Sequence, residues 1–269
     1  MTAQTRKHAT KGTALITGAS SGIGAVYADR LARRGYDLIL VARRRDRLDT
    51  LAALIAADTG RHAEVLVADL AVKADLLALE QRLQSDPSIS VLVNNAGFGA
   101  ATPLVESDPD LLEAMIQLNV TALTRLTRAA APAFVRRGSG TIINIASIVA
   151  VAPELLNGTY SGSKAYVVNF TQSLHHELSA KGIQVQAVLP GATRTEFRDV
   201  LGYPVHNLKD ETVMSAGDLV DAALAALDQH ELITIPSLPD PQHWETLNSA
   251  RVALGPYLSR KEAAQRYKH

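Results

Sequence analysis

Tyr160 and Lys164 are four residues apart, a spacing that places both side chains on one face of an α-helix. A phenol with an ordinary pKa near ~10 is a poor acid or base at neutral pH, but a neighbouring ammonium group lowers that pKa. Tyr160 could then donate a proton to a carbonyl oxygen as hydride arrives at the carbon, or remove the proton in the reverse direction. Taken alone, the two residues are equally compatible with an ordinary surface pair.

Two further polar residues occupy positions that invite a functional reason. Ser147 follows an apolar run at residues 141–145, and the carboxyl ends of such strands are where α/β sheets bind ligands. Its hydroxyl could orient and polarise a substrate oxygen, or it could cap the next helix. Asn119 falls inside a helix predicted over residues 109–136, where asparagine weakens helix propensity. It is either functional or a satisfied polar residue.

Residues 17–24 read Thr-Gly-Ala-Ser-Ser-Gly-Ile-Gly and join a predicted strand to an amphipathic helix that runs to about Arg34. Glycine permits a tight turn, small residues let backbone amides approach a pyrophosphate, and the helix N-terminus adds partial positive charge. The spacing departs from the strict G-x-G-x-x-G fingerprint, so a turn without a ligand is the alternative. The predicted anion-binding residues are Gly18, Ser20, Ser21, Gly22, Ile23 and Gly24.

The second strand ends in residues 41–45, Val-Ala-Arg-Arg-Arg. An acidic residue at this end would bind the ribose 2′-hydroxyl of NAD and repel a 2′-phosphate. Here Ala42 leaves room, and Arg43 or Arg44 could hold that phosphate with paired hydrogen bonds. NADP(H) is therefore the predicted cofactor. A solvated basic helix start is the alternative, and it is weakened because cations at a helix N-terminus are electrostatically unfavourable.

Seven short apolar runs alternate with longer segments of helical period. They lack a clean alternation of polar and apolar residues, which is typical of parallel strands buried on both faces. The pattern predicts an α/β fold with a doubly wound, seven-stranded parallel sheet and helices on both faces. The predicted strands are residues 14–17, 38–41, 63–67, 89–93, 141–145, 185–189 and 232–235.

The composition sets limits on partners and location. With 27 basic and 27 acidic residues, the 269-residue chain offers no charge argument for nucleic acid or an anionic membrane. No apolar run approaches the roughly 18 residues of a membrane span, and the absence of cysteine fits a reducing compartment, the cytoplasm by default. His175 and His176 are adjacent and cannot share a helix face, so no metal is assigned.

We expect one catalytic domain over residues 12–269, after a flexible leader at 1–11 and with a substrate-loop insertion at about 196–213. The tail continues as predicted helix through Trp244 and Leu254, and again from Ser259.

Five motifs together resemble those of the short-chain dehydrogenase/reductase family, in the proper order, and span nearly the whole of residues 12–195. They are residues 17–24, Asn94-Asn95-Ala96-Gly97, Ser147, Tyr160-x3-Lys164 and Pro190-Gly191. The resemblance implies a Rossmann-type fold and a reaction that interconverts a carbonyl and an alcohol. It also implies that Lys164 holds the nicotinamide ribose and that Asn119 holds a water in a proton relay reaching Lys164.

The resemblance further implies cofactor contacts at the ends of the later strands. These are Asp69 and Leu70 at the adenine, Asn95, Ala96 and Gly97 beside the adenosine ribose and nicotinamide, Pro190 and Gly191 over the nicotinamide, and Thr193 and Thr195 near its amide or the pyrophosphate. Part of the role of residues 95–97 is to stabilise the sheet.

Substrate identity is not encoded in any motif. Candidate apolar lining residues, beside Ser147, are Phe98, Val149, Leu155, Phe197, Leu201 and Tyr203. Residues 236–240 lack a glycine pair that is often found in tetrameric members of the family that the chain resembles. A homo-oligomer, either a dimer or a tetramer, is expected. Met115, Leu118, Leu123 and Leu126 could supply a dimer face or ordinary core packing.

Three functions from different classes fit a βαβ start: a carbonyl reductase, a non-catalytic NAD(P)-sensing regulator and a methyltransferase. The set of Asn119, Ser147, Tyr160 and Lys164 favours the first, because neither alternative needs that constellation.

Overall fold

The apolar runs predicted as strands form one parallel sheet in the computed structural model, which describes residues 10–196 and 209–268. The sheet has seven strands in the order β3-β2-β1-β4-β5-β6-β9, and each neighbouring pair is parallel. The predicted fold class is confirmed. The strands are β1 (Thr13–Thr17), β2 (Asp37–Ala42), β3 (Ala63–Val67), β4 (Ile89–Asn94), β5 (Gly140–Ile145), β6 (Ile183–Val188) and β9 (Ile233–Thr234).

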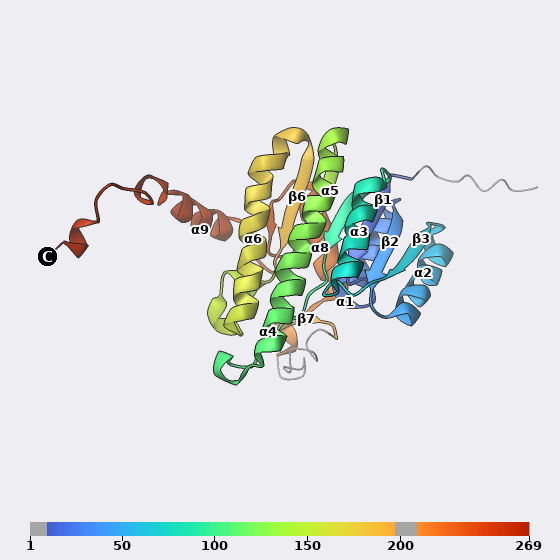
Figure 1. The fold of residues 1–269 in the computed structure, drawn as a ribbon, viewed down its shortest axis with the longest axis horizontal. Coiled ribbons are helices and arrows are strands. Elements are labelled where there is room, and N and C mark those ends of the chain that lie inside the picture. The colour runs from blue at the N-terminus through green and yellow to red at the C-terminus, as the bar shows by residue number, and fades with distance from the viewer. Residues whose placement is uncertain (1–9, 197–208, 269) are drawn as a thin grey trace, which may run out of the picture. The chain divides into compact units, whose positions relative to one another are not determined.

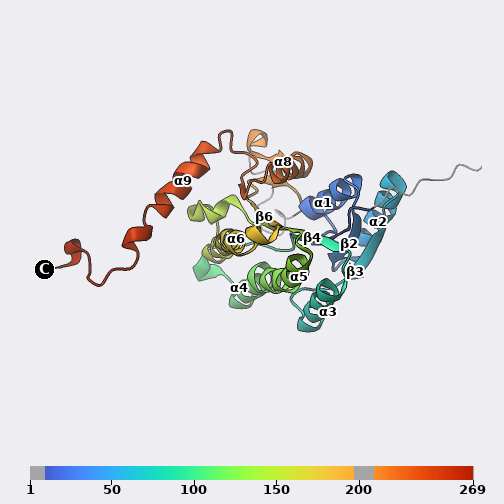
Figure 2. The ribbon, with the colours of Figure 1, turned by 90° about the horizontal axis from the view of Figure 1, so that it is seen from above.

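Helices cover both faces of the sheet (Figures 1 and 2). Side chains alternate between the two layers, as β1 illustrates: Ala14 and Ile16 enter one apolar core and Leu15 the other. One core is covered by α1 (Gly22–Arg33), α2 (Arg45–Thr59) and α8 (Ala216–Asp228), and the other by α3 (Lys73–Ser85), α5 (Leu123–Arg137) and α6 (Gly158–Leu178). Among the described helices, none has the length and apolarity that crossing a membrane requires.

The strand order reverses between β1 and β4. From this point β2 and β3 extend the sheet in one direction, and β5, β6 and β9 extend it in the other. Ligands of doubly wound sheets bind outside the carboxyl ends of the strands at such a reversal. Thr17 ends β1 and Asn94 ends β4, so the chain carries residues 18–24 and 95–97 to this edge.

The single helix predicted over residues 109–136 is wrong in one respect. α4 (Pro109–Ile116) and α5 are joined by a π-helical segment, Gln117–Ala122, which contains Asn119. Wider turns of this kind are rare and frequently occur at functional sites.

The apolar residues of these middle helices serve the core. Met115, Leu123 and Leu126 are buried. Leu118 is half-buried and packs against the core that contains Leu126. Core packing therefore accounts for them, and they give no argument for a dimer face.

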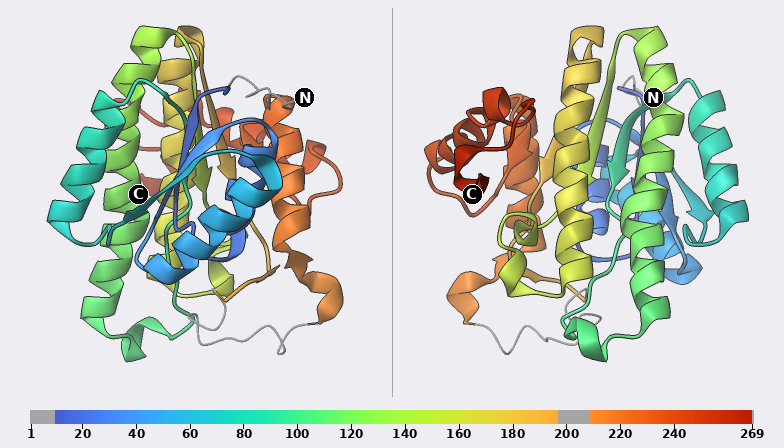
Figure 3. Two further views of the ribbon diagram at one scale, coloured as in Figure 1. Left: turned by 90° about the vertical axis from the view of Figure 1, so that its right-hand side faces the viewer. Right: turned by 60° about the vertical axis from the view of Figure 1, so that its left-hand side comes forward.

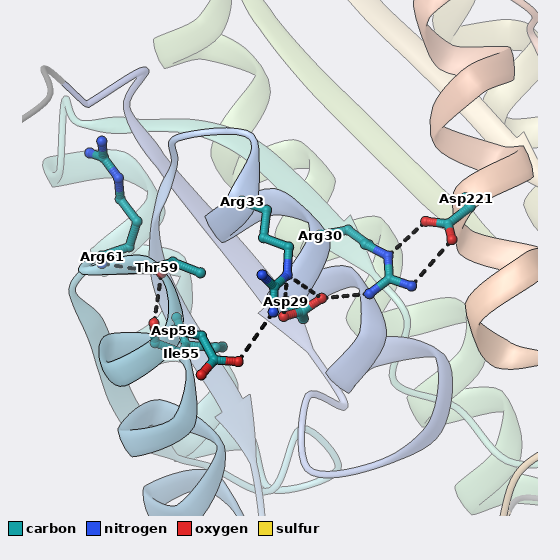
Figure 4. A network of polar contacts seen from close by, with 8 residues as sticks. All are labelled: Asp29, Arg30, Arg33, Ile55, Asp58, Thr59, Arg61 and Asp221. Atoms are coloured by element: carbon teal, nitrogen blue, oxygen red, sulfur yellow. Dashed lines mark hydrogen bonds and ion pairs between the residues drawn. The ribbon is translucent and has the colours of Figure 1, made fainter.

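Ion pairs attach α1 to its two neighbours (Figure 4). Arg30 Nε lies 2.7 Å from Asp221 Oδ1 on α8, and Arg33 Nη2 lies 3.2 Å from Asp58 Oδ2 on α2. Asp29 accepts from both arginines. Exposed pairs contribute at most about 1 kcal/mol each. These pairs link α1, the helix that follows the glycine turn, to α8 and α2.

The chain divides into two compact units, Met1–Pro236 and Ser237–His269. The second contains α9 (Gln242–Val252) and two 3-10 turns, Gly255–Tyr257 and Gln265–Tyr267. The helix predicted from Ser259 is wrong, because only the turn at Gln265–Tyr267 forms there. Residues 253–268, which follow α9, are all exposed, so packing contributes little to stabilise a helix there.

Candidate active site

α6 carries the predicted acid–base pair and begins two residues before Tyr160. Asn157 caps this helix: its Oδ1 accepts from Thr159 N at 2.8 Å. Its Nδ2 donates to Thr102 O at 2.6 Å and to Ser107 Oγ at 3.2 Å. The same amide thus fixes both the start of the helix and the loop after β4. Asn157 was not among the predicted site residues, although an asparagine directly before a helix is a recognisable cap signal.

Tyr160 and Lys164 are both buried, at 4% and 5% exposure. The Lys164 ammonium lies 5.9 Å from the centroid of the Tyr160 ring and donates to the Ile145 carbonyl at the end of β5, at 2.9 Å. Burial lowers the pKa of Lys164 to about 8, because removal from water penalises the charged form. The two residues are therefore not an ordinary surface pair, and the Lys164 ammonium is more acidic than that of an exposed lysine.

Asn119 meets Lys164 across Gly97. The Asn119 side chain donates from Nδ2 to Phe98 O at 2.8 Å and to Ser163 Oγ at 3.1 Å, and its Oδ1 accepts from Phe98 N at 3.1 Å. A Cβ added to Gly97 would lie 2.8 Å from Asn119 Oδ1 and 3.6 Å from Lys164 Nζ. Glycine is needed here because Asn119, from the π-helical segment, and Lys164, from α6, both come close to the backbone at this position.

Ser147 follows β5 at the same edge and is 7% exposed. Its hydroxyl accepts from Val149 N at 3.4 Å, a weak cap of the 3-10 turn Ile148–Ala150, and donates to Pro190 O at 3.5 Å. Both distances are long for hydrogen bonds. The hydroxyl therefore retains most of its capacity to bond a ligand oxygen.

The glycine turn is fastened to β4 by Thr17 and Asn95. Thr17 Oγ1 accepts from the backbone amides of Asn95 and Ala96, both at 3.0 Å, and Asn95 Nδ2 donates to Thr17 O at 2.9 Å and Gly18 O at 3.2 Å. Gly18 has φ +67°, and a Cβ there would lie 2.7 Å from Asn95 Nδ2, so a larger residue is excluded. The Asn95 side chain is thus committed to shaping the turn.

A chain of buried amides and hydroxyls links the sheet to the helices behind the site. Asn94 Nδ2 donates to Thr127 Oγ1 on α5 at 3.0 Å and to Asn144 Oδ1 on β5 at 2.9 Å. Asn144 Nδ2 in turn donates to Thr171 Oγ1 on α6 at 2.9 Å. This network was not predicted. The sequence signal for it is the presence of asparagine within two otherwise apolar strand runs.

At the end of β2, the structure separates the two candidate arginines. Arg44 Nη2 donates to Ser21 Oγ at 2.8 Å and to Ser20 Oγ at 3.2 Å, directly on the glycine turn. The Arg43 side chain is 77% exposed and lies 3.9 Å from Asp69. Arg44 is therefore the arginine that the structure brings to the turn.

Other predicted cofactor residues follow the carboxyl ends of β3 and β6, at the same edge of the sheet as the glycine turn. Asp69 and Leu70 follow β3, with Asp69 Oδ1 accepting from Ala71 N at 3.0 Å. After β6, Thr193 is buried and donates to Gly191 O at 3.1 Å. A Cβ added to Gly22 would lie 3.1 Å from Cγ2 of Thr195, so Thr195 lies against the glycine turn.

A short parallel pairing, not predicted, secures the base of the insertion. β7 (Thr193–Arg194) pairs with β8 (Met214–Ser215), and Met214 N donates to Ala192 O at 2.9 Å. The two ends of the insertion are thereby held next to the segment after β6.

An apolar cluster surrounds Tyr160. It contains Ala100, Met115, Val149 and Tyr160, with Phe98, Leu112 and Leu156 packed against it. Of the predicted lining residues, Phe98 and Val149 belong to this cluster, whereas Leu155 is 54% exposed. Phe197, Leu201 and Tyr203 lie outside the described residues.

Fold and site together define the class of protein. A doubly wound sheet with helices on both faces (Figure 3) brings to one edge a glycine turn of the kind that binds anions and a buried tyrosine, lysine and serine, as in a nucleotide-dependent oxidoreductase. The family model described as short chain dehydrogenase matches residues 12–202. The chain belongs to that family and is an oxidoreductase.

Solved structures agree closely with this assignment. A short-chain dehydrogenase from Sphingobium yanoikuyae, in complex with NADPH, is 49% identical, with a TM-score of 0.92, over 95% of this chain and 100% of that one. The bulky-bulky ketone specific alcohol dehydrogenase from Comamonas testosteroni is 44% identical, with a TM-score of 0.90, over 97% of this chain and 100% of that one.

Among curated relatives, a very-long-chain 3-oxoacyl-CoA reductase from Anas platyrhynchos is 36% identical over 70% of this chain. The match covers 61% of the length of that reductase.

Proposed function

We propose that this protein interconverts a ketone or aldehyde and the corresponding alcohol by hydride transfer with NADP(H), and that Tyr160 is its general acid and base. The observation that carries the proposal is the convergence of Tyr160, Lys164, Ser147 and Asn119 at the sheet edge that also holds the glycine turn. Those four side chains come from α6, the end of β5 and the π-helical segment.

The donor groups at this edge fit NADP(H), which supplies or accepts the hydride when bound. The backbone of residues 18–24 would hold the pyrophosphate, and Lys164 would hold the nicotinamide ribose. Arg44, with the hydroxyls of Ser20 and Ser21 at its guanidinium, would hold the 2′-phosphate, for which planar guanidinium groups are well suited. The relative solved with NADPH supports this choice.

The proton steps follow from the side chains. In reduction, the Tyr160 hydroxyl gives its proton to the carbonyl oxygen while the carbonyl carbon gains hydride, and the product is the alcohol. Ser147 donates a hydrogen bond to the same oxygen and stabilises its developing negative charge. The nearby Lys164 ammonium favours the phenolate that Tyr160 leaves behind. Asn119 positions this end of the site through Phe98 and Ser163.

The apolar cluster around Tyr160 supports a ketone with apolar substituents as substrate. Met115, Val149 and Leu156 place only apolar side chains in the cluster that contains Tyr160. The name of the Comamonas testosteroni relative, which specifies bulky ketones, agrees with this class. A homo-oligomer and a cytoplasmic location remain predictions.

The proposal is tested by following NADPH oxidation with a panel of ketones and aldehydes. Tyr160→Phe should abolish turnover while NADPH still binds, as measured by the fluorescence of the bound nicotinamide. Undiminished turnover in this variant would refute the role of Tyr160, and absence of turnover with every carbonyl in the wild-type protein would refute the reaction.

A further inference from the structure

Two arginines of the cofactor edge converge on one carboxylate from a distant part of the chain. Arg44 Nη1 lies 3.1 Å from Glu196 Oε2, and Arg47 Nη1 lies 2.5 Å from Glu196 Oε1. Glu196 comes just after β7 and is 149 residues from Arg47. The guanidinium of Arg47, followed by that of Arg44, lowers the pKa of Glu196, so the group is a carboxylate at neutral pH.

Arg44 and Arg47 lie at the start of α2, where the helix dipole disfavours positive charge. Arg44 is the N-cap residue of α2 and Arg47 lies in its first turn, next to the positive end of the helix dipole. Asp46 is the acidic residue of that turn, and Glu196 supplies a second negative charge from outside the helix. The arginines therefore form a site that an anion stabilises.

A carboxylate and a phosphate satisfy this site in the same way. Guanidinium groups bind either anion with charge-assisted hydrogen bonds. Arg44 also donates to Ser20 and Ser21 of the glycine turn, so the Glu196 carboxylate is bound by the group assigned above to the 2′-phosphate. Thr195, the neighbour of Glu196, lies against Gly22 of the same turn.

We propose that Glu196 is an internal competitor for the 2′-phosphate of NADP(H): its carboxylate occupies Arg44 and Arg47, and the phosphate must displace it to bind. Arg47 thereby becomes a third arginine that determines cofactor specificity, beside Arg43 and Arg44, the two candidates for binding the 2′-phosphate. This inference rests on the proposed NADP(H) dependence and deepens it. Displacement is required for a ligand that carries the 2′-phosphate and not for one that lacks it.

The test compares 2′,5′-ADP, which carries the phosphate, with 5′-ADP, which lacks it, by isothermal titration calorimetry at low ionic strength. The variant is Glu196→Gln, which keeps the size of the side chain and removes its charge. Glu245→Gln on α9 is the matched control, because Glu245 is exposed and its loss changes the net charge equally. All proteins are full-length, and NADPH and NADH are titrated in parallel.

Glu196→Gln should bind 2′,5′-ADP about two- to tenfold more tightly than wild type, the range expected for releasing two exposed ion pairs. Binding of 5′-ADP and the behaviour of Glu245→Gln should be unchanged, and the gain should shrink as salt screens the charges. NADPH should follow 2′,5′-ADP, and NADH should follow 5′-ADP.

Unchanged or weaker binding of 2′,5′-ADP by Glu196→Gln would overturn the inference; weaker binding would mean that Glu196 helps to retain the bound nucleotide. An equal gain for 5′-ADP would overturn it too, since the competition would then not concern the phosphate. Wild-type protein that binds the two nucleotides equally would instead refute the NADP(H) assignment, and this inference with it.

Discussion

Replacement of Lys164 by methionine should change how the stability of the protein depends on pH. Burial lowers the pKa of Lys164 from its ordinary value of 10.5 to about 8, and the side chain is 5% exposed. At ~1.4 kcal/mol for each tenfold change in proton affinity, keeping this ammonium in the folded protein costs about 3 kcal/mol. Methionine fills a similar volume without the charge.

The sign of the effect follows from where the proton resides. Below pH 8, folded and unfolded wild type both hold it, so the full cost is present. Between pH 8 and 10.5 the unfolded chain retains the proton and the folded protein has lost it, so wild type gains stability as pH rises. Above that window the gain is complete. Lys164→Met lacks this titration, and titratable groups other than its neighbour Tyr160 cancel in the comparison.

The measurement is urea unfolding of both proteins between pH 7 and pH 11, with carbonyl reduction assayed alongside. The free energy of unfolding of wild type minus that of Lys164→Met should rise by about 3 kcal/mol across the window. At pH 7, removal of the cost is partly offset by loss of the hydrogen bond to Ile145 O, worth about 1–3 kcal/mol. The variant should therefore be about as stable as wild type or more so, yet inactive. A difference that does not vary with pH would refute the reasoning.

Three further predictions concern the groups around the site. Arg44→Gln should raise KM for NADPH roughly 10- to 100-fold, as expected for loss of a charge-assisted contact, and Arg43→Gln should raise it less because Arg43 is 77% exposed; equal effects in steady-state kinetics would contradict the assignment. Asn94→Ala should lower the free energy of unfolding by about 1–3 kcal/mol, because Asn144 Oδ1 and Thr127 Oγ1 lose their donor; urea unfolding indistinguishable from wild type would exclude a stabilising network. Asn157→Ala should lower the free energy of unfolding by about 1 kcal/mol through loss of the helix cap. It should also lower kcat for ketone reduction more than it lowers the affinity for NADPH. A loss confined to NADPH affinity would contradict a role of Asn157 near Tyr160.

Much of this architecture can be predicted from local sequence patterns. Buried parallel strands need continuous apolar runs, and β1, β4 and β5 follow such runs closely. The glycine turn can also be predicted locally, because a backbone with φ +67° at Gly18 strongly favours glycine. Tyr160 and Lys164 were predicted from helical spacing and family motifs, and both of those signals are carried by residues close together in the chain.

The missed features depend on partners distant in the sequence. Whether Arg43 or Arg44 turns toward Ser20 and Ser21 is a matter of side-chain direction at the end of β2. The π-helical segment contains Asn119, which bonds to Phe98 and Ser163, and no helical pattern encodes these distant partners. The helix predicted from Ser259 had acceptable local composition but lacked tertiary packing.

The sequence by itself therefore determined the sheet and the family of the chain, and it predicted the reacting groups, because periodicity and motif spacing are properties of neighbouring residues. Only the tertiary structure decided how those groups are charged and engaged. Lys164 has its pKa lowered by burial beneath the folded chain, and Arg47 meets Glu196 across 149 residues of sequence. Burial and the pairing of charges arise when distant segments pack together, and no local pattern specifies them.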